Sequence, residues 1–273
     1  MTRMVAVVPA RMGSSRFPGK PLAPLLGRPV VEHVVRRASM CEAPAAVYVA
    51  TCDEEIRAAV EGFGGRVVMT SAAHERASDR VAEAAENIEA AEGFEADIVV
   101  MIQGDEPMVT PGMIAAALTP MLRDPSIQCV NLARRINSPE EYFDRNTIKV
   151  VTDVRGGALY FSRAPIPAIE FARDFSGAAG LRPPVFKQVC VIPFRRERLR
   201  EFARLPPTPL ERAESVDMLR LVEHGLGVRL VETEEDTHAV DTPEDLRLVE
   251  GLMRDDPLLR RYGEALAGGA ARV

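Results

Sequence analysis

Tryptophan is absent from this sequence, tyrosine and phenylalanine occur only 4 and 10 times, and the excess of acidic side chains gives a formal net charge of -6. Proteins that bind nucleic acids generally present a basic surface, and those that bind single strands add aromatic side chains on which bases stack. The composition therefore argues against a nucleic-acid-binding protein. Any binding site for an anion must be local.

Cysteine is also scarce, and the four cysteines are Cys41, Cys52, Cys129 and Cys190. They form no CxxC pair and have no histidine at metal-ligand spacing, which argues against a zinc site. We interpret them as reduced core residues. Free thiols of this kind are typical of a cytoplasmic protein.

Long hydrophobic runs are missing as well. The segment MTRMVAVVPA is apolar for only a few residues before Arg11, which is too short for a signal peptide. No other run approaches the roughly 20 apolar residues of a membrane-spanning helix. We therefore expect a protein that is neither exported nor inserted in a membrane.

Short apolar runs do occur, and through the first half of the chain they alternate with segments of helical period. Strands are expected at 4–9, 46–51, 66–70 and 97–103, and helices at 29–40, 53–64, 78–90 and 111–122. The strand runs are continuously apolar, as in strands covered by helices on both faces. This pattern predicts an α/β fold with a doubly wound, mostly parallel, Rossmann-like sheet.

The pattern changes after Cys129, where strands follow one another without long helices between them. They are expected at 129–136, 148–153, 157–162 and 185–194, which predicts a small antiparallel insertion or flap. A helix from about Thr208, a strand at 229–234 and a helix at 243–254 follow. We expect one domain over residues 1–255, with the insertion at about 158–205, and a C-terminal extension over 256–273.

The loop ARMGSSRFPGK follows the first buried strand directly. It holds three cations, two glycines and two serines: Arg11, Arg16, Lys20, Gly13, Gly19, Ser14 and Ser15. Glycines permit close approach of the backbone, hydroxyls donate hydrogen bonds, and cations neutralise phosphates. The loop matches neither the P-loop nor the GxGxxG pattern. It predicts a phosphate-binding loop, with a solvated basic loop as the alternative.

Two further loops place carboxylates after predicted strands. In QGDEP, Asp105 ends a fully apolar strand and is a candidate Mg²⁺ ligand, because Mg²⁺ binds few protein carboxylates together with phosphate oxygens and water. An ordinary turn is the alternative for Asp105, and Glu106 is left open between structural and functional roles. In HAVDTPEDL, Thr242 can cap a helix, so Asp241 is either part of that cap or a second Mg²⁺ ligand.

Together these segments resemble the CMP-Kdo synthetases (3-deoxy-manno-octulosonate cytidylyltransferases). The resemblance rests on ARMGSSRFPGKPL, QGDEP, IKVV, GALYFSRAPIP, TPLERAESVDMLR and VDTPEDL, in this order, and covers roughly residues 5–248. It implies a nucleotidyltransferase in which the anomeric hydroxyl of an acceptor attacks the α-phosphorus of CTP. A CMP-sugar and pyrophosphate would form with the help of Mg²⁺.

The resemblance also implies site residues. Catalytic roles would go to Arg16, Lys20 and Asp105, and the metal would be held by Asp105 and Asp241. The nucleotide would be bound by Pro9, Ala10, Arg11, Gly13, Ser14, Ser78, Arg80, Gln103 and Gly104. The anionic acceptor would be bound by Gln103, Arg163, Lys187, Gln188, Glu211 and Glu214. For Glu211, a capping box in TPLE is the alternative. Lys149 and Arg195 are expected to be structural.

Two stretches depart from the family pattern. The family's HxGIYxYR-like strand aligns with residues 187–195, where Gln188, Cys190 and Ile192 replace histidine, glycine and tyrosine. In HERASDR, Arg76 and Ala77 replace the serine and glycine of a stretch that helps read cytidine. A pocket that loses its polar contacts loses selectivity for a polyhydroxylated acid.

Several hypotheses therefore remain at this point. The acceptor is Kdo or a related sugar acid, or a small carboxylate or phosphonate such as phosphonoformate, which Lys187 and Arg163 would suit. A nucleotidyltransferase for another base and a catalytically inactive nucleotide-binding module are further alternatives. Residues 164–194 would pack against a second subunit of a homodimer, or form a lid over the acceptor.

Overall fold

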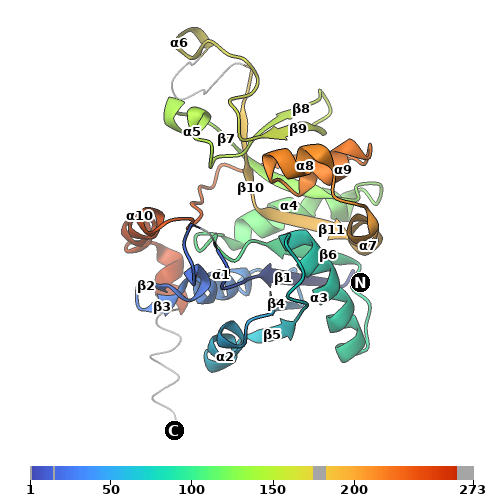
Figure 1. Cartoon of the computed structure of the whole chain (residues 1–273), viewed down its shortest axis with the longest axis vertical. Helices are drawn as coiled ribbons and strands as arrows, with labels where there is room; N and C mark the ends of the chain where they lie inside the picture. The colour runs from blue at the N-terminus through green and yellow to red at the C-terminus, as the bar shows by residue number, and fades with distance from the viewer. Residues whose placement is uncertain (1, 15, 175–182, 263–273) are drawn as a thin grey trace.

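The first sheet of the protein has five strands in the order β11-β6-β1-β4-β5. A computed structural model describes residues 2–14, 16–174 and 183–262 (Figure 1). The parallel strands are β1 (Met4–Pro9), β4 (Ala46–Thr51), β5 (Arg66–Met69) and β6 (Ile98–Ile102). β11 (Val191–Arg195) pairs with β6 in the antiparallel direction and forms one edge.

Helices cover both faces of this sheet. They are α1 (Val30–Ala38), α2 (Glu54–Gly62), α3 (Ala77–Glu92), α4 (Pro111–Arg123) and α7 (Arg196–Arg204). In β1, Ala6 and Val8 pack in a cluster with α1, α2 and α4, whereas Val5 and Val7 pack in a cluster with α3 and α7. Neighbouring residues of a strand point to opposite faces, so both faces are buried. The predicted doubly wound, mainly parallel sheet is confirmed.

The second sheet has the strand order β12-β7-β10-β8-β9 and lies at the other end of the molecule (Figure 1). Its strands are β7 (Val130–Arg135), β8 (Lys149–Thr152), β9 (Ala158–Ser162), β10 (Phe186–Val189) and β12 (Arg229–Glu232). All pairings are antiparallel except that of β12 with β7.

The strand expected at 185–194 differs from the prediction because it breaks at Cys190. Its first half, β10, pairs with β7 and β8 of the second sheet, and its second half, β11, pairs with β6 of the first. Both halves are apolar, so the sequence pattern does not reveal that the chain passes between sheets here.

The remaining elements are short, apart from one helix near the C-terminus. They are η1 (Lys20–Leu22), β2 (Pro24–Leu25), β3 (Arg28–Pro29), α5 (Pro139–Phe143), α6 (Phe171–Asp174), α8 (Pro209–Glu214), α9 (Met218–Glu223) and α10 (Pro243–Met253). The helix predicted from about Thr208 is therefore two helices. Between them Ser215 has a φ of 55°, in the left-handed region, where an α-helix cannot continue.

Part of the predicted C-terminal extension packs on α1. Arg37, which is fully buried, forms an ion pair with Asp256, and His33 Nδ1 lies 2.6 Å from the Tyr262 hydroxyl. Burial lowers the pKa of His33 to about 4, so the ring is neutral in this contact. Within the described part of the chain, no helix combines the length and apolar character that a membrane span requires.

Candidate active site

A cavity of about 360 Å³ opens at the carboxyl ends of β1 and β6, where ligands bind in open α/β sheets. We call it the first cavity. Its wall is formed by the loop after β1, the loop before α3, the loop after β6, and single residues from later in the chain. The predicted residues in this wall are Pro9, Ala10, Arg11, Gly13, Ser14, Arg16, Lys20, Arg80, Gln103, Gly104, Asp105 and Asp241. Ser15 lies outside the described residues.

The loop after β1 is folded back on itself. The Met12 carbonyl accepts a hydrogen bond of 3.0 Å from Gly19 N–H, and Met12 N–H donates to Asp53 Oδ2 at 2.7 Å. Gly19 has a φ of 76°, which side chains disfavour, so glycine is required at this turn. Gly13 differs, since a Cβ atom there would meet nothing within 4 Å. Gly13 lies in the wall of the first cavity, and the space that a side chain would fill there is open.

Lys20 lies between the two predicted metal ligands. Its Nζ donates to the carboxylate of Asp105 and to Asp241 Oδ1 at 2.9 Å. Arg16 Nη2 lies 2.9 Å from Asp241 Oδ2. Burial opposes the charge of Lys20, but the two carboxylates outweigh it and raise the pKa of the ammonium. Two carboxylates and two cations from three distant segments therefore meet in the first cavity.

The backbone fixes this arrangement. Val240 N–H donates to the Asp105 carbonyl at 2.8 Å, which joins the two carboxylate-bearing loops. Thr242 and Asp245 form a capping box for α10, with Asp245 N–H donating to Thr242 Oγ1 at 3.1 Å. The cap therefore does not use the Asp241 carboxylate, which lies with Lys20 and Arg16 instead.

A second cavity of about 500 Å³ adjoins the first and shares wall residues with it, including Gln103, Asp105 and Asp241. We call it the second cavity. Predicted acceptor residues Arg163, Lys187 and Gln188 lie in its wall. The residues predicted for the nucleotide and for the acceptor are thus brought to adjacent spaces, with the Asp105 loop between them.

Arg163 is held by Glu214, which is not part of either wall. The Glu214 carboxylate accepts from Arg163 N–H at 2.8 Å and from Ser162 Oγ at 2.7 Å, and its carbonyl accepts from Arg163 Nε at 2.8 Å. Burial acts to raise the pKa of the Glu214 carboxylate. The hydrogen bonds that Ser162 and Arg163 N–H donate to this carboxylate outweigh the effect of burial, so the pKa is lowered. Glu214 therefore positions Arg163.

Lys187 is 8% exposed and already has two acidic partners. Its Nζ donates to Glu141 Oε1 at 2.5 Å and to Asp236 Oδ1 at 3.2 Å. The ammonium charge is thus compensated within the protein. Gln188 donates from Nε2 to Asn131 Oδ1 at 2.6 Å. Asn131 is fully buried on β7, and its position between two apolar residues, Val130 and Leu132, is the signal that the sequence offers.

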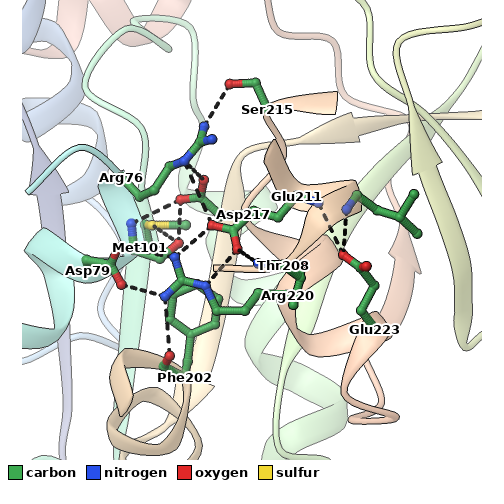
Figure 2. Close-up of polar contacts among 12 residues, drawn as sticks. Arg76, Asp79, Met101, Phe202, Thr208, Glu211, Ser215, Asp217, Arg220 and Glu223 are labelled. Carbon is green, nitrogen blue, oxygen red and sulfur yellow. Dashed lines mark hydrogen bonds and ion pairs between the residues drawn. The ribbon is translucent and has the colours of Figure 1, made fainter. Parts of the chain in front are cut away.

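Glu211 and Ser78 lie outside both walls. Glu211 is fully buried, accepts two hydrogen bonds from Arg220 and one from Thr208 N–H, and completes the capping box of α8 (Figure 2). Ser78 Oγ donates to Asp217 at 2.8 Å. The structure therefore does not bring these two predicted residues to the substrate side.

The two residues expected to be structural are tied to the backbone. Lys149 Nζ is buried and donates to the carbonyls of Asp144, Thr147 and Arg163 at 2.7, 2.6 and 2.9 Å. Burial lowers the pKa of Lys149 to about 8. Arg195 Nη2 donates to the Met121 carbonyl at 2.5 Å.

Two wall residues were missed or left open by sequence reasoning. Glu106 lies in the wall of the second cavity and bonds to Thr237, and burial raises the pKa of its carboxyl group to about 7. Asp217 lies in the same wall, and burial raises its pKa too. No local pattern marks Asp217, because its partner Ser78 is 139 residues away.

Comparison with known proteins gives a consistent result. The family described as "Cytidylyltransferase" matches residues 5–235. The 3-deoxy-manno-octulosonate cytidylyltransferases of Geobacter metallireducens and Geobacter sulfurreducens are 45% and 44% identical, over 92% and 90% of this chain and 98% and 97% of theirs. A solved structure of CMP:2-keto-3-deoxy-manno-octonic acid synthetase complexed with CTP is 39% identical, with a TM-score of 0.80 over 92% of this chain and 98% of that one.

Proposed function

Because the chain belongs to the 3-deoxy-manno-octulosonate cytidylyltransferase (CMP-Kdo synthetase) family of nucleotidyltransferases, we propose that it transfers CMP from CTP to Kdo and releases pyrophosphate. The observation that carries the proposal is the meeting of Lys20, Asp105 and Asp241 in a cavity that adjoins a second one. Nucleotidyl transfer needs cations for the triphosphate and an acceptor space beside it. Both are present.

In the proposed reaction, the anomeric hydroxyl oxygen of the acceptor attacks the α-phosphorus of CTP. The bond from that phosphorus to the bridging oxygen breaks, the attacking hydroxyl loses its proton to water, and pyrophosphate leaves. Negative charge accumulates on the phosphate oxygens during this step, so fixed cations stabilise the transition state. Arg11, Arg16 and Lys20 would supply this charge from one loop.

We also propose that Asp105 and Asp241 hold Mg²⁺. Among the described residues no group of three or more His, Cys, Asp or Glu side chains could hold a metal. Mg²⁺ nevertheless fits a pair of carboxylates, because triphosphate oxygens and water complete its octahedron. Both carboxylates contact the Lys20 Nζ, so they lie close enough together to serve one site. When bound, Mg²⁺ would neutralise phosphate charge and acidify the acceptor hydroxyl.

The second cavity favours Kdo over a small dianion. The phosphonate hypothesis relied on two cations, Lys187 and Arg163, but Lys187 is paired with Glu141 and Asp236. Of these two cations only Arg163 then remains for the acceptor, which suits the single carboxylate of a sugar acid. A space of about 500 Å³ with amide and carboxyl groups in its wall also suits a polyhydroxylated acceptor.

The proposal includes a homodimer in the cytoplasm. Exposed apolar side chains support an interface: in the second sheet Leu159 on β9 is 56% exposed, and Val154 precedes that strand and is fully exposed. Large exposed apolar side chains often mark interaction surfaces. All four cysteines are free, which supports a reducing compartment.

The test is pyrophosphate release from CTP with Kdo, run beside the other three nucleoside triphosphates and beside phosphonoformate as acceptor. We expect release only with CTP and Kdo, and its loss when Mg²⁺ is chelated. Asp105→Asn and Asp241→Asn should each lower kcat/KM roughly a hundredfold or more. Asp124→Asn, at an exposed residue after α4, is the matched control. Efficient release with phosphonoformate but not Kdo would contradict the acceptor assignment.

A further inference from the structure

The turn between α8 and α9, residues 214–217, touches the walls of both cavities. On the acceptor side it is joined to β9, because Glu214 accepts hydrogen bonds from Ser162 Oγ, Arg163 N–H and Arg163 Nε. All three distances are 2.7 or 2.8 Å. A displacement of the turn would therefore carry the Arg163 guanidinium with it.

On the nucleotide side the same turn is joined to the start of α3. Arg76 Nη1 donates to Ser215 Oγ at 2.7 Å (Figure 2). Asp217 Oδ2 accepts from Ser78 Oγ at 2.8 Å. Arg76 is the residue that precedes α3, and it lies in the walls of both cavities. Its guanidinium points toward Ser215, and Asp217 lies beside its Nε (Figure 2).

Backbone preference does not hold the turn in place. Ser215 adopts a φ of 55°, and a non-glycine residue reaches this left-handed conformation only when surrounding contacts enforce it. The contact made by the Ser215 side chain itself is the hydrogen bond from Arg76. Arg76 therefore adds a side-chain contact at the residue where the backbone is least favourable, beside the backbone hydrogen bond from Ser215 N–H to the Glu211 carbonyl.

Charge gives Arg76 a second role at the turn. Its Nε lies 3.9 Å from Asp217 Oδ1 and 3.8 Å from Glu211 Oε1. Arg220 already pairs with Glu211 and with Asp79 at 2.7 Å each. Arg76 is thus a cation beside the half-buried Asp217 carboxylate, which adds to the contact between the turn and the start of α3.

We propose that Arg76 is a positioning residue for the acceptor: it fixes the 214–217 turn and, through Glu214, aims Arg163 into the second cavity. The inference rests on the proposed function, since it assumes that Arg163 meets the acceptor. It also makes acceptor binding sensitive to the loop before α3, which lies in the wall of the first cavity.

Steady-state kinetics with separate Michaelis constants tests the proposal. Arg76→Ala and Ser215→Ala should each raise KM for Kdo roughly tenfold, the effect of losing one hydrogen bond to a charged group. KM for CTP should stay within about twofold, because the interaction is made on the acceptor side. The double variant should be no worse than Arg76→Ala alone, since both substitutions remove the same hydrogen bond. Arg57→Ala, at a half-exposed arginine on α2 outside both cavity walls, is the control.

The charge of Asp217 provides a competing explanation that the same series separates. If Arg76 acted only by neutralising Asp217, then Ser215→Ala would be silent and Asp217→Asn would restore the activity of Arg76→Ala. That result would overturn the proposal. Equal rises in KM for CTP and Kdo would overturn it too, because they would place Arg76 in nucleotide binding.

Hydrogen exchange of the substrate-free enzyme gives a readout that does not depend on turnover. In Arg76→Ala and in the milder Ser215→Ala, amides of residues 158–164 and 213–218 should exchange faster, while those of α2 should not change. Unchanged exchange at residues 158–164 would refute the link to Arg163. A wild-type enzyme that fails to use Kdo would refute the proposed function instead, and the exchange result would still decide whether Arg76 fixes the turn.

Discussion

Replacing Glu211 by alanine separates a structural role from an acceptor-binding role for this residue. The carboxylate is fully buried and accepts from Arg220 Nε at 2.9 Å, from Arg220 Nη2 at 2.7 Å and from Thr208 N–H at 3.1 Å. Alanine removes all three hydrogen bonds and leaves Arg220 buried with one carboxylate partner, Asp79, in place of two. The loss of these hydrogen bonds should lower the free energy of unfolding.

The expected size follows from these contacts. Removing one partner of a buried ion pair costs about 3–5 kcal/mol, because the remaining charge is left uncompensated. Since Arg220 retains Asp79 at 2.7 and 3.2 Å, we expect the lower end, about 3 kcal/mol. At about 2–4 °C per kcal/mol for a domain of this size, the melting temperature should fall by about 6–12 °C. Glu211→Gln keeps the shape and some hydrogen bonds and should cost about 1–3 kcal/mol.

The assay combines urea unfolding with kinetics measured well below the melting temperature. If Glu211 is structural, the free energy of unfolding falls and KM for Kdo stays near the wild-type value. A double-mutant cycle with Arg220→Ala should show strong coupling, since both variants break the same pair. An unchanged melting temperature together with a large rise in KM for Kdo would refute this reasoning and favour the acceptor-binding role.

Two further predictions concern the loops of the site. Gly104→Ala should reduce stability and activity together, because a Cβ atom there would lie 2.7 Å from the Pro9 carbonyl, whereas Gly13→Ala should leave stability within about 0.5 kcal/mol and raise KM for CTP. Urea unfolding and CTP titrations check both, and equal stability losses would contradict the contrast. Burial raises the pKa of Glu106 in the folded protein from its ordinary value of 4.5 to about 7, so the folded state binds this proton more tightly than the unfolded state does. The stabilising contribution is therefore present at acid pH and is lost as the pH rises to about 7. Between pH 5.5 and 8 the wild type should lose about 2 kcal/mol relative to Glu106→Gln, measured by urea unfolding, and parallel curves would count against the assignment.

Much of the fold and of the first cavity could be predicted from the sequence. Continuous apolar runs separated by helical segments admit few arrangements other than a parallel sheet covered on both faces. The carboxyl ends of parallel strands share one edge, so the loops after β1 and β6 had to meet there. Lys20 and Asp105 contact each other for this reason, although 85 residues separate them.

The acceptor side was less accessible to sequence reasoning. From the sequence alone, Lys187 and Glu211 are candidate ligands for an acceptor, because their ion-pair partners are not known at that stage. Lys187 is compensated by Glu141 and Asp236, and Glu211 by Arg220. Ion pairs between distant segments depend on how the second sheet packs against the helices around it. No local pattern encodes that packing.

The sequence by itself determined most of the elements, the parallel sheet and the position of the basic loop after β1, because these follow from local periodicity and from the common edge of parallel strands. Only the tertiary structure decided that the chain passes between two sheets at Cys190 and that the 214–217 turn links Arg76 to Arg163. The reason is physical. Hydrophobic periodicity records which face of an element is buried, whereas the pairing of buried charges depends on which distant element covers that face.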